Sequence, residues 1–282
     1  MFYRRLLFCG GGVRVIAHVG ALERLKDEIT FVKEFCGVSA GALLAMCMAI
    51  GYTIAELREF ILGFDFTNVI DTASPPELLL NFGLDTGNRL QKMVEACIRV
   101  KGLSGEITFS QLDKGLRVYA TNLNTAEFIT FSKETTPSMK VADAVRASMS
   151  FPYYFQPYSD ESGHLFGDGG IISNFPMFTL SDQEKDHTIG FLFEENCGEV
   201  MEITDFGQFM MRPFVINMQS RSKADIRNYK KWSVISKVGS ISPLEFSLDD
   251  DAKKKLLEMG KEGAEDWLKR KQIIPTRRYS AC

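Results

Sequence analysis

Short apolar runs alternate with helical periodicity over the first sixty residues. Residues 5–9 form an apolar run that predicts a strand ending at three glycines. Residues 31–36 predict a second strand, and an apolar run over residues 40–52 predicts a buried helix. Between the two strands, apolar side chains recur at three-residue spacing and predict another helix; they are Ile16, Val19, Leu22 and Leu25. This order of strand, turn and helix is typical of a parallel sheet with helices packed on its faces.

The pattern becomes irregular after an amphipathic helix predicted over residues 54–62. Residues 63–86 contain Phe64, Phe66, two prolines and the run Leu78–Leu80 among turn residues. The segment is either a connection with one short helix or a mobile apolar cap over a site, because long loops in compact domains are often functional. The pattern favours neither interpretation.

Periodicity returns at residue 86 and continues to about residue 193. The predicted elements are a helix over 86–98, strands over 116–121 and 128–131, a helix over 141–149, and strands over 165–166 and 188–193. We expect residues 1–282 to form a single domain, with a mainly helical C-terminal part over residues 205–282. The last residues, 269–282, carry a basic excess, which favours a solvated tail over a contact with anionic lipid headgroups.

Composition narrows the possible partners. Apolar residues make up 45% and charged residues 24% of the chain, as in ordinary globular proteins with a sizeable core. The 33 basic and 36 acidic side chains leave a net charge of −3. A surface that binds nucleic acid normally carries a basic excess, so we expect no nucleic acid partner.

The cysteines and the N-terminal sequence indicate the cellular compartment in which the protein is expected. Six cysteines occur without a CxxC pair, which disfavours a zinc site, a redox motif and a disulfide framework. The N-terminal apolar run is too short for a signal peptide, and the run over residues 40–52 is shorter than the ~20 residues that cross a bilayer. We therefore expect an intracellular protein, cytoplasmic or peripherally membrane-associated, without a transmembrane helix, a metal or a cofactor.

Residues 37–41 read Gly-Val-Ser-Ala-Gly and fit the G-x-S-x-G pattern between a predicted strand and a predicted helix. A turn that raises a serine oxygen above the sheet edge must be tight, and Gly37 and Gly41 leave room for it. The helix that begins at Ala40 offers free N–H groups to an oxyanion. The pattern predicts Ser39 as a nucleophile, with a simple Gly/Ser turn as the alternative.

A second glycine turn, Gly10-Gly11-Gly12, precedes Val13 and Arg14 and also lies between a strand and a helix. Successive glycine N–H groups in such a turn form an anion-binding nest. A dinucleotide site would need glycine where Val15 stands and would use Glu34 as its ribose contact. An oxyanion hole is the other possibility. Both glycine turns follow neighbouring parallel strands and open at the same edge, which favours the oxyanion hole.

Asp168 precedes Gly169 and Gly170 after a predicted strand. An Asp-Gly pair alone is more often a hairpin turn, but a carboxylate on a glycine turn can also approach Ser39 and take its proton. The histidines compete poorly for this role: His18 lies within a helix, His164 in a polar turn and His187 at a strand start. Although His187 satisfies the Ser…Asp…His order of α/β-hydrolases, a Ser39–Asp168 dyad is the simpler hypothesis.

Taken in order, the three glycine motifs make the chain resemble a patatin-like phospholipase. Intermediate stretches agree. Residues 120–125 resemble the family's strand and turn before its strand at 128–131, residues 145–152 resemble its A-S-x-x-x-P segment, and residues 174–176 match its N-x-P. The resemblance spans about residues 5–180.

This resemblance implies an α/β fold, a three-layer α/β/α sandwich with a mostly parallel central sheet. It implies Ser39 as nucleophile, Asp168 as general base, and an oxyanion hole from the Gly10–Gly12 loop aided by Arg14. Calcium-independent hydrolysis of ester bonds in phospholipids or other lipids, phospholipase A2-like, follows, with contact to a membrane or lipid surface. The family usually has glycine where Val15 stands, and a branched side chain there can narrow the loop.

Two other classes stay open. A catalytically idle lipid-binding or interaction protein on the same fold would bind liposomes but resist a fluorophosphonate probe. A nucleotide-binding protein using the Gly10–Gly12 loop would be stabilised by a nucleotide.

Overall fold

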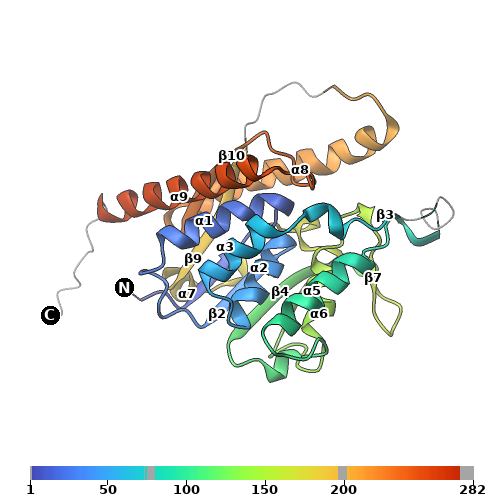
Figure 1. Cartoon of the computed structure of the whole chain (residues 1–282), viewed down its shortest axis with the longest axis horizontal. Helices are drawn as coiled ribbons and strands as arrows, with labels where there is room; N and C mark the ends of the chain where they lie inside the picture. Colours follow the sequence, from blue (N-terminus) through green and yellow to red (C-terminus); the bar gives the residue numbers. More distant parts are fainter. Residues whose placement is uncertain (1, 73, 75–79, 196–201, 274–282) are drawn as a thin grey trace.

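The computed structural model describes residues 2–72, 74, 80–195 and 202–273. In this part of the chain an eight-stranded sheet runs through the middle, and helices cover both of its faces (Figure 1). The expected three-layer α/β/α arrangement is thereby confirmed.

The sheet is mixed, with a parallel half and an antiparallel edge. The strands are β1 (Arg5–Phe8), β2 (Glu34–Val38), β3 (Gly83–Asp85), β4 (Gly115–Asn122), β5 (Glu127–Ser132), β6 (Tyr153–Phe155), β7 (Tyr158–Ser159), β8 (Leu165–Asp168), β9 (Thr188–Glu195) and β10 (Ser233–Gly239). Their order in the main sheet is β10-β9-β1-β2-β4-β8-β7, with β5 also paired to β4. The first five are mutually parallel, whereas β5, β7 and β8 are antiparallel to their partners. β3 and β6 form a separate parallel ribbon.

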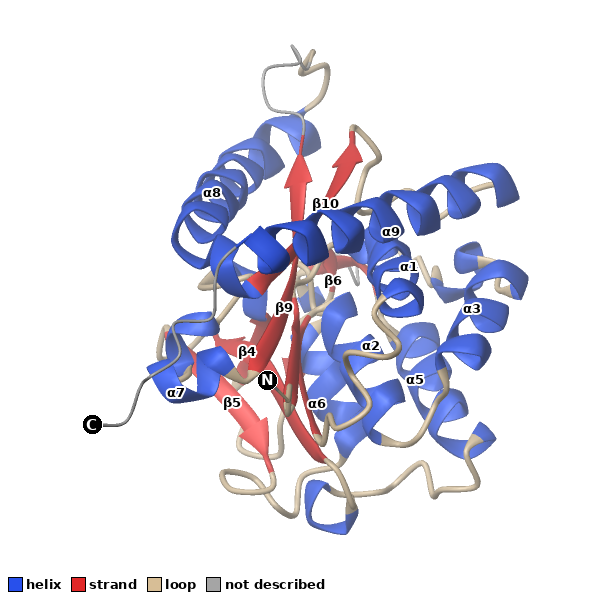
Figure 2. Ribbon diagram, turned by 90° about the vertical axis from the view of Figure 1, so that its left-hand side faces the viewer, coloured by secondary structure: helices blue, strands red, loops and turns tan. Residues whose placement is uncertain are grey.

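The helices divide between the two faces of the sheet. They are α1 (Ile16–Arg24), α2 (Ala40–Ala49), α3 (Ile54–Gly63), α5 (Asn88–Val100), α6 (Val141–Ser148), α7 (Asp182–Asp186), α8 (Phe206–Tyr229) and α9 (Asp250–Ile273). Short 3-10 turns are η1 (Gly12–Val15), η2 (Phe66–Val69), η3 (Phe109–Gln111), η4 (Gly169–Ile171), η5 (Met177–Thr179) and η6 (Lys230–Trp232). Figure 2 shows α7 and α8 on one face of the sheet and α1, α2, α3 and α5 on the other.

The parallel half of the sheet is the centre of the core. All four residues of β1 are buried, because helices cover the sheet on both sides and strands in that position read as continuous apolar runs. Helix α2 is almost entirely buried, as its apolar sequence predicts.

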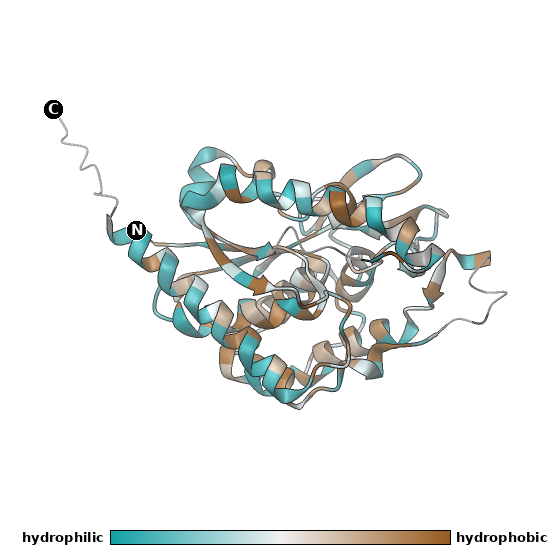
Figure 3. Cartoon of the chain, turned by 90° about the horizontal axis from the view of Figure 1, so that it is seen from above, coloured by the Kyte–Doolittle hydropathy of each residue, from teal (hydrophilic) through white to brown (hydrophobic). Residues whose placement is uncertain are grey.

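Helices α1 and α9 cross closely through two glycines. A Cβ at Gly20 would lie 1.9 Å from the Leu257 oxygen, and one at Gly260 would lie 1.8 Å from the Ala17 oxygen. Apolar and polar residues interchange along α9, the helix that leads to the C-terminal trace in Figure 3. Its apolar side, which includes Leu257, is buried in the core, so α9 closes the α1 face of the molecule.

Two sequence expectations about strands were wrong in position or kind. The second strand occupies Glu34–Val38 and not residues 31–36, and Phe31 instead stacks edge-to-face on Phe2 at the surface. In the part expected to be helical or irregular, β10 adds a parallel strand to the sheet. Its buried Ser233 and Ser236 interrupt the apolar pattern that would have revealed it.

Residues 63–86 contain both fixed and exposed parts. The rings of Phe64 and Phe66 pack together, and Lys253 of α9 lies 5.5 Å from the centre of the Phe66 ring. Leu80 is largely exposed, while Leu78 and Leu79 lie outside the described residues. The described part is thus a connection with one 3-10 turn and the short strand β3.

Within the described residues, no helix combines the length and the apolar character that crossing a membrane requires. The cysteines in this part, Cys9, Cys36, Cys47 and Cys97, are buried and free of disulfides. Cys197 and Cys282 lie outside it.

Candidate active site

Ser39 occupies a strained turn between β2 and α2. Its φ of 55° and ψ of −132° lie in a region that side chains rarely adopt, at a typical cost of about 1–3 kcal/mol. The flanking glycines make the turn possible. A Cβ at Gly37 would lie 2.2 Å from the Gly41 oxygen, and one at Gly41 would lie 2.5 Å from the Cys9 oxygen. The G-x-S-x-G sequence therefore folds as a tight strand-to-helix turn at the carboxyl edge of the sheet, which is the geometry that a nucleophile elbow requires.

Ser148, the C-terminal residue of α6, holds this turn from below. The Ser39 N–H donates to the Ser148 hydroxyl over 2.8 Å, and that hydroxyl donates to the Tyr119 carbonyl over 2.6 Å. Ser148 is fully buried, so its two hydrogen bonds link the elbow rigidly to β4. The Ser39 amide is consequently engaged and cannot contact a ligand.

Strand register brings Asp168 level with Ser39. Val38 pairs with Tyr119 across β2 and β4, and Asp168 pairs with the next residue, Ala120, across β4 and β8. Ser39 and Asp168 therefore stand on either side of β4, about 10 Å apart along two strand spacings. The Ser39 side chain nevertheless approaches the Asp168 carboxyl closely enough to lower its pKa by hydrogen bonding. Gly169 allows the chain to pass over β4, because a Cβ there would lie 2.5 Å from the Tyr119 oxygen.

The Asp168 carboxylate is buried, and among the described residues no cation pairs with it. Its Oδ1 accepts from the Gly170 N–H over 2.7 Å, and Oδ2 has no hydrogen-bond partner among the described residues. Burial raises the pKa of Asp168 to about 6, although the Ser39 hydroxyl and the Gly170 N–H both favour the charged form. A carboxylate with this pKa is mostly ionised at neutral pH and is a competent proton acceptor.

The Gly10–Gly12 loop lies against the elbow. A Cβ at Gly10 would lie 2.7 Å from the Ser39 Cβ, so glycine is needed for this approach. The Gly10 N–H donates to the Asn174 side chain over 3.0 Å, and the Asn174 side-chain N–H donates back to the Gly10 carbonyl over 3.0 Å. Asn174 thus fixes the loop next to Ser39.

The amides of this loop differ in their availability. Val13 N–H donates to the Pro243 carbonyl over 3.0 Å, and Arg14 N–H donates to the Gly11 carbonyl over 3.1 Å. The amides of Gly10, Val13 and Arg14 are therefore occupied. Those of Gly11, Gly12 and Ala40 make no hydrogen bond to the described residues.

The loop after β10 supports the glycine loop from outside. A Cβ at Gly12, whose φ is +55°, would lie 1.8 Å from the Pro243 oxygen. The buried Arg14 donates through Nε to the Ile241 carbonyl over 2.6 Å. Arg14 is a support of the loop in this arrangement.

Val15 fits the loop without distortion. Its φ of −58° and ψ of −16° lie in the ordinary right-handed region, where glycine has no advantage. The half-buried side chain packs against the core. The substitution of the family's usual glycine therefore leaves the backbone of the loop intact.

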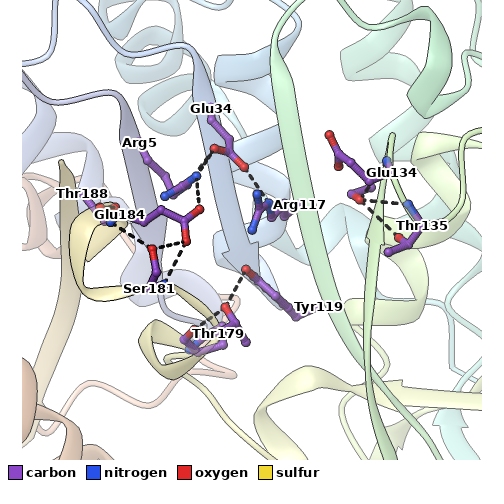
Figure 4. Close-up of polar contacts among 12 residues, drawn as sticks. Arg5, Glu34, Arg117, Tyr119, Glu134, Thr135, Thr179, Ser181, Glu184 and Thr188 are labelled. Atoms are coloured by element: carbon purple, nitrogen blue, oxygen red, sulfur yellow. Dashed lines mark hydrogen bonds and ion pairs between the residues drawn. The ribbon is translucent and has the colours of Figure 1, made fainter. Parts of the chain in front are cut away.

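Glu34 lies at the amino edge of the sheet, far from the glycine loop. It accepts from Arg5 over 2.7 Å and contacts Arg117 at 2.6 Å, and Arg5 also reaches Glu184 (Figure 4). Five strand residues separate this position from Gly10, a distance of about 16 Å. Glu34 cannot act as the ribose contact of a dinucleotide site in that loop.

The surroundings of the three histidines do not suit them to act as a base for Ser39. His187 precedes β9 at the amino edge, about 20 Å along the strand direction from Ser39, and contacts the Phe2 carbonyl. His18 is fully buried beside Cys9 and stacked on Phe193, and burial lowers its pKa to about 3. His164 lies in an exposed turn. Neither histidine near the sheet is placed to accept the Ser39 proton.

Ser39 and Asp168 line a cavity of about 900 Å³, a size typical of ligand sites. One wall is apolar and comes from α2, α3, η2 and α5; its side chains are Leu43, Leu44, Cys47, Leu57, Phe60, Ile61, Phe66, Val69, Leu90 and Met93. The other wall comes from α8 and the loop after β10 and mixes polar and apolar side chains. The described residues contain no cluster of three or more His, Cys, Asp or Glu side chains suited to a metal.

The sequence analysis assigned no role to several residues that support or line the site. Ser148 and Asn174 stand within quoted motifs, but only their contacts reveal what they support. The α8 wall and the Pro243 loop carry no motif. The spacing of polar residues along 208–222 is the one signal that could have placed α8 against a cavity.

An α/β/α sandwich with a strained serine at the carboxyl edge of its sheet defines a protein of the nucleophile-elbow class. The sequence model of the family described as patatin-like phospholipase matches residues 6–180, a stretch that holds both glycine turns and Asp168. The chain belongs to the patatin-like phospholipase family, a family of lipid acyl hydrolases.

Relatives cover most of the chain. It is 34% identical over 271 residues to an uncharacterised protein of Acanthamoeba polyphaga mimivirus, with 91% of both chains aligned. It is 30% identical over 182 residues to a probable lipid hydrolase of Invertebrate iridescent virus 6, with 62% of both chains aligned.

Solved structures show the same fold. VipD from Legionella pneumophila superposes with a TM-score of 0.65 at 18% identity, covering 96% of this chain and 67% of VipD. ExoU from Pseudomonas aeruginosa, in complex with SpcU, superposes with a TM-score of 0.56 at 15% identity, covering 96% of this chain and 53% of the other. The shared fold therefore includes α8, β10 and α9.

Proposed function

We propose that the protein is a serine acyl hydrolase that cleaves lipid esters, phospholipase A2-like, with Ser39 as nucleophile and Asp168 as general base. The observation that carries the proposal is the pairing of a strained serine with a buried, cation-free carboxylate at one cavity. Strain and a raised carboxyl pKa both cost stability, and such features concentrate at functional sites.

In the proposed reaction the Ser39 hydroxyl attacks the ester carbonyl while Asp168 accepts its proton. The new oxyanion receives hydrogen bonds from the unoccupied amides of Gly11, Gly12 and Ala40, an effect worth ~3–4 kcal/mol per donor in a comparable site. Asp168 then gives the proton to the departing alcohol. In the second half, Asp168 takes a proton from water as the water oxygen attacks the acyl-enzyme. The bond between the acyl carbon and the Ser39 oxygen then breaks, Asp168 returns the proton to that oxygen, and the fatty acid departs.

The apolar wall supports a fatty acyl chain as the group that is bound. Burying each methylene of such a chain contributes ≈ 0.8 kcal/mol, and the side chains of α2, α3 and α5 next to Ser39 offer the surface for it. The site requires no metal or cofactor in this reaction, since an aspartate and backbone amides supply the proton transfer and the charge stabilisation.

Labelling with a fluorophosphonate probe tests the proposal. We expect the wild-type protein to be labelled and to hydrolyse a chromogenic long-chain ester, and Ser39→Ala to lose the label and at least about 10³-fold in kcat. Circular dichroism should show that the variant stays folded. A wild-type protein that binds liposomes but takes up no label would instead be the idle lipid-binding protein.

We further propose that the protein contacts a lipid surface around the mouth of the cavity. Exposed apolar side chains occur on or next to the β3/β6 ribbon, whose Phe155 lines the cavity, and on α8; they are Phe82, Leu84, Tyr153, Phe209 and Ile216. The two segments meet where Phe151, which lines the cavity, contacts the ring of Phe214 at 5.3 Å. Clustered exposed apolar groups are typical of interaction surfaces.

Vesicle co-sedimentation tests this contact. The double variant Phe82→Ser/Phe209→Ser should lower binding to phosphatidylcholine vesicles by about tenfold, because each ring loses a favourable burial of about 1.5–3 kcal/mol at most. Phe31→Ser is the matched control, since Phe31 is 56% exposed but lies at the opposite edge of the sheet. Equal losses for the two proteins would show that the mouth is not the contact.

A further inference from the structure

We propose that His18 is a positioning residue for the oxyanion hole, which it holds in shape through two contacts, one with the Cys9 carbonyl and one with the Phe193 ring. This inference rests on the proposed function and deepens it, because it concerns the loop whose amides would receive the oxyanion. His18 is not among the described residues that line the cavity, whereas Ile16 and Val19 of the same helix are. It therefore acts on the site through other residues and does not touch the substrate.

The first contact joins α1 to the residue that follows β1. His18 Nε2 lies 3.3 Å from the Cys9 carbonyl oxygen and 3.6 Å from the Cys9 Sγ. Because a carbonyl oxygen can only accept a hydrogen bond, Nε2 carries the hydrogen and donates it. The Cys9 carbonyl shares one planar peptide unit with the Gly10 N–H, which donates to the Asn174 side chain over 3.0 Å. His18 and Asn174 thus hold the two ends of the first peptide unit of the loop.

The next peptide unit contains the Gly10 carbonyl and the Gly11 N–H. The Asn174 side-chain N–H donates to that carbonyl over 3.0 Å. In a trans peptide the carbonyl and the N–H point in opposite directions, and the described residues contain no cis peptide bond. The Gly11 N–H therefore points away from Asn174. It makes no hydrogen bond to the described residues, so its direction depends on how firmly these two peptide units are held.

The second contact is a stack that reaches the loop from the α1 side. The rings of His18 and Phe193 are parallel to within 4°, with their centres 4.2 Å apart. The Phe193 ring in turn contacts Gly11, where a Cβ would lie 2.5 Å from the ring atom Cε2. Phe8 and Phe191 lie against the imidazole with ring centres 5.8 Å and 5.7 Å away. The aromatic cluster thus fixes His18, and His18 fixes the Phe193 ring next to the free Gly11 amide.

These surroundings call for an uncharged ring that has one donor. His18 is fully buried, and burial lowers its pKa to about 3, so the imidazole is neutral near pH 7. Its Nδ1 is buried and has no hydrogen-bond partner among the described residues. A buried nitrogen without a partner is destabilising, and phenylalanine in the same place would avoid that cost. The donor that Nε2 supplies to Cys9 accounts for a histidine at this position.

Two substitutions separate the two contacts. His18→Phe keeps a ring against Phe193 but removes the donor to the Cys9 carbonyl, and His18→Leu removes both. Deleting an oxyanion donor outright lowers kcat by about 10²–10³-fold, and a donor that is displaced but still present should cost less. We expect kcat/KM for a chromogenic long-chain ester to fall about tenfold in His18→Phe and about 100-fold in His18→Leu.

A pair of inhibitors distinguishes positioning from general destabilisation. An alkyl trifluoromethyl ketone forms a tetrahedral adduct with a serine oxygen and places an oxyanion in the hole, whereas the matching alkyl methyl ketone binds without the adduct. The Ki of the trifluoromethyl ketone should rise by the factor by which kcat/KM falls, and the Ki of the methyl ketone should change less than twofold. Equal changes in the two Ki values, or an unchanged kcat/KM in both variants, overturn the inference.

Leu22→Val is the matched control for stability. Leu22 lies one turn further along α1 and is as fully buried as His18. Removing a methylene there should lower Tm but change kcat/KM by less than twofold. If this variant loses as much activity as His18→Phe, the loss reflects stability alone and the inference is wrong.

Nitrogen NMR of the wild-type protein, labelled with ¹⁵N in its histidine rings, needs no variant to fold. The ring signals of His18 should show a protonated Nε2 and an unprotonated Nδ1, unchanged between pH 5 and 8. A hydrogen on Nδ1 instead, or a titration near pH 6.5, would contradict the contact with Cys9.

The outcomes also separate this inference from the proposed chemistry. If the wild-type protein hydrolyses the ester and His18→Phe does so equally well, the positioning role fails and the proposed function stands. If the wild-type protein neither hydrolyses the ester nor takes up the fluorophosphonate label, the proposed function fails and the positioning role fails with it.

Discussion

Two carboxylates at opposite edges of the same sheet have opposite surroundings. Glu34, at the amino edge, is held by Arg5 and Arg117 and is one member of a network of ion pairs. Asp168, at the carboxyl edge, is buried; its Oδ1 accepts from the Gly170 N–H, and its Oδ2 has no hydrogen-bond partner in the part of the chain that the structure describes. Glu34 lies one strand from β1, on the parallel strand β2, whereas Asp168 lies three strands from β1, on the antiparallel strand β8.

The same sheet thus holds two carboxylates with different roles. Glu34 stabilises the fold through ion pairs, and Asp168 is the proton acceptor in the proposed reaction. The guanidinium groups of Arg5 and Arg117 both pair with the Glu34 carboxylate and tie it into the ion-pair network. Burial raises the pKa of Asp168 to about 6, and its Oδ2 has no hydrogen-bond partner among the described residues. A carboxylate that is poorly satisfied in the folded protein is the one suited to accept a proton.

The largest effect is expected from Asp168→Asn. The amide preserves the shape of the carboxylate but cannot accept the Ser39 proton, so kcat/KM for a lipid ester should fall by about 10³-fold. In the wild type, kcat/KM should rise tenfold per pH unit up to about pH 6 and then level off, because the base must be ionised. A pH–rate profile of both proteins between pH 4.5 and 8.5 checks this, and the limb near pH 6 should be missing from the variant.

His187→Ala is the matched control for that experiment. The imidazole lies at the Glu34 edge of the sheet, so its removal should change kcat by less than twofold. A loss of several orders of magnitude would restore a Ser–Asp–His triad and would break the contrast between the two edges.

The smaller effect is on stability, and the two carboxylates should differ in sign. The folded pKa of Asp168 lies above its ordinary value, so its contribution is favourable at low pH and is lost as pH rises through about 6. At pH 8 the buried charge of Asp168 lowers the free energy of unfolding by about 3 kcal/mol, and Asp168→Asn should raise Tm by a few degrees at pH 8 but not at pH 4.

Glu34→Gln should lower Tm at pH 8, because it removes an ion-pair partner of the buried Arg5 at a cost of about 1–3 kcal/mol. Thermal unfolding at the two pH values measures both; a lower Tm for Asp168→Asn at pH 8 would contradict the assignment.

Much of the parallel half of the fold could be predicted from the sequence, because burial on both faces leaves an unambiguous pattern. The apolar runs of β1 and α2 and the glycines between them indicate both the elements and the edge where they open. The second strand was predicted three residues too early, because Phe31, an apolar residue at the predicted start, packs on Phe2 outside the sheet. Pattern alone cannot distinguish an apolar strand residue from one in a surface pair.

The candidate site was predictable where a backbone turn demands glycine and unpredictable where support comes from distant segments. Gly37, Gly41 and Gly169 mark the turns that bring Ser39 and Asp168 together. Nothing local identifies Asn174 as the clamp of Gly10, or Pro243 as the partner of Val13. These contacts join residues more than 160 positions apart, and they depend on strand order, which the sequence pattern does not specify.

The Pro243 carbonyl that receives the Val13 amide has a consequence for how this protein can be divided. The stretch that carries every recognisable motif ends near residue 180, yet one side of its anion-binding turn is built by a loop sixty residues further on. A fragment that contained only the motifs would include Ser39 and Asp168 but would lack the Pro243 loop, which supports the Gly10–Gly12 turn. The shortest segment that can form the complete site is therefore longer than the segment that carries the family's motifs.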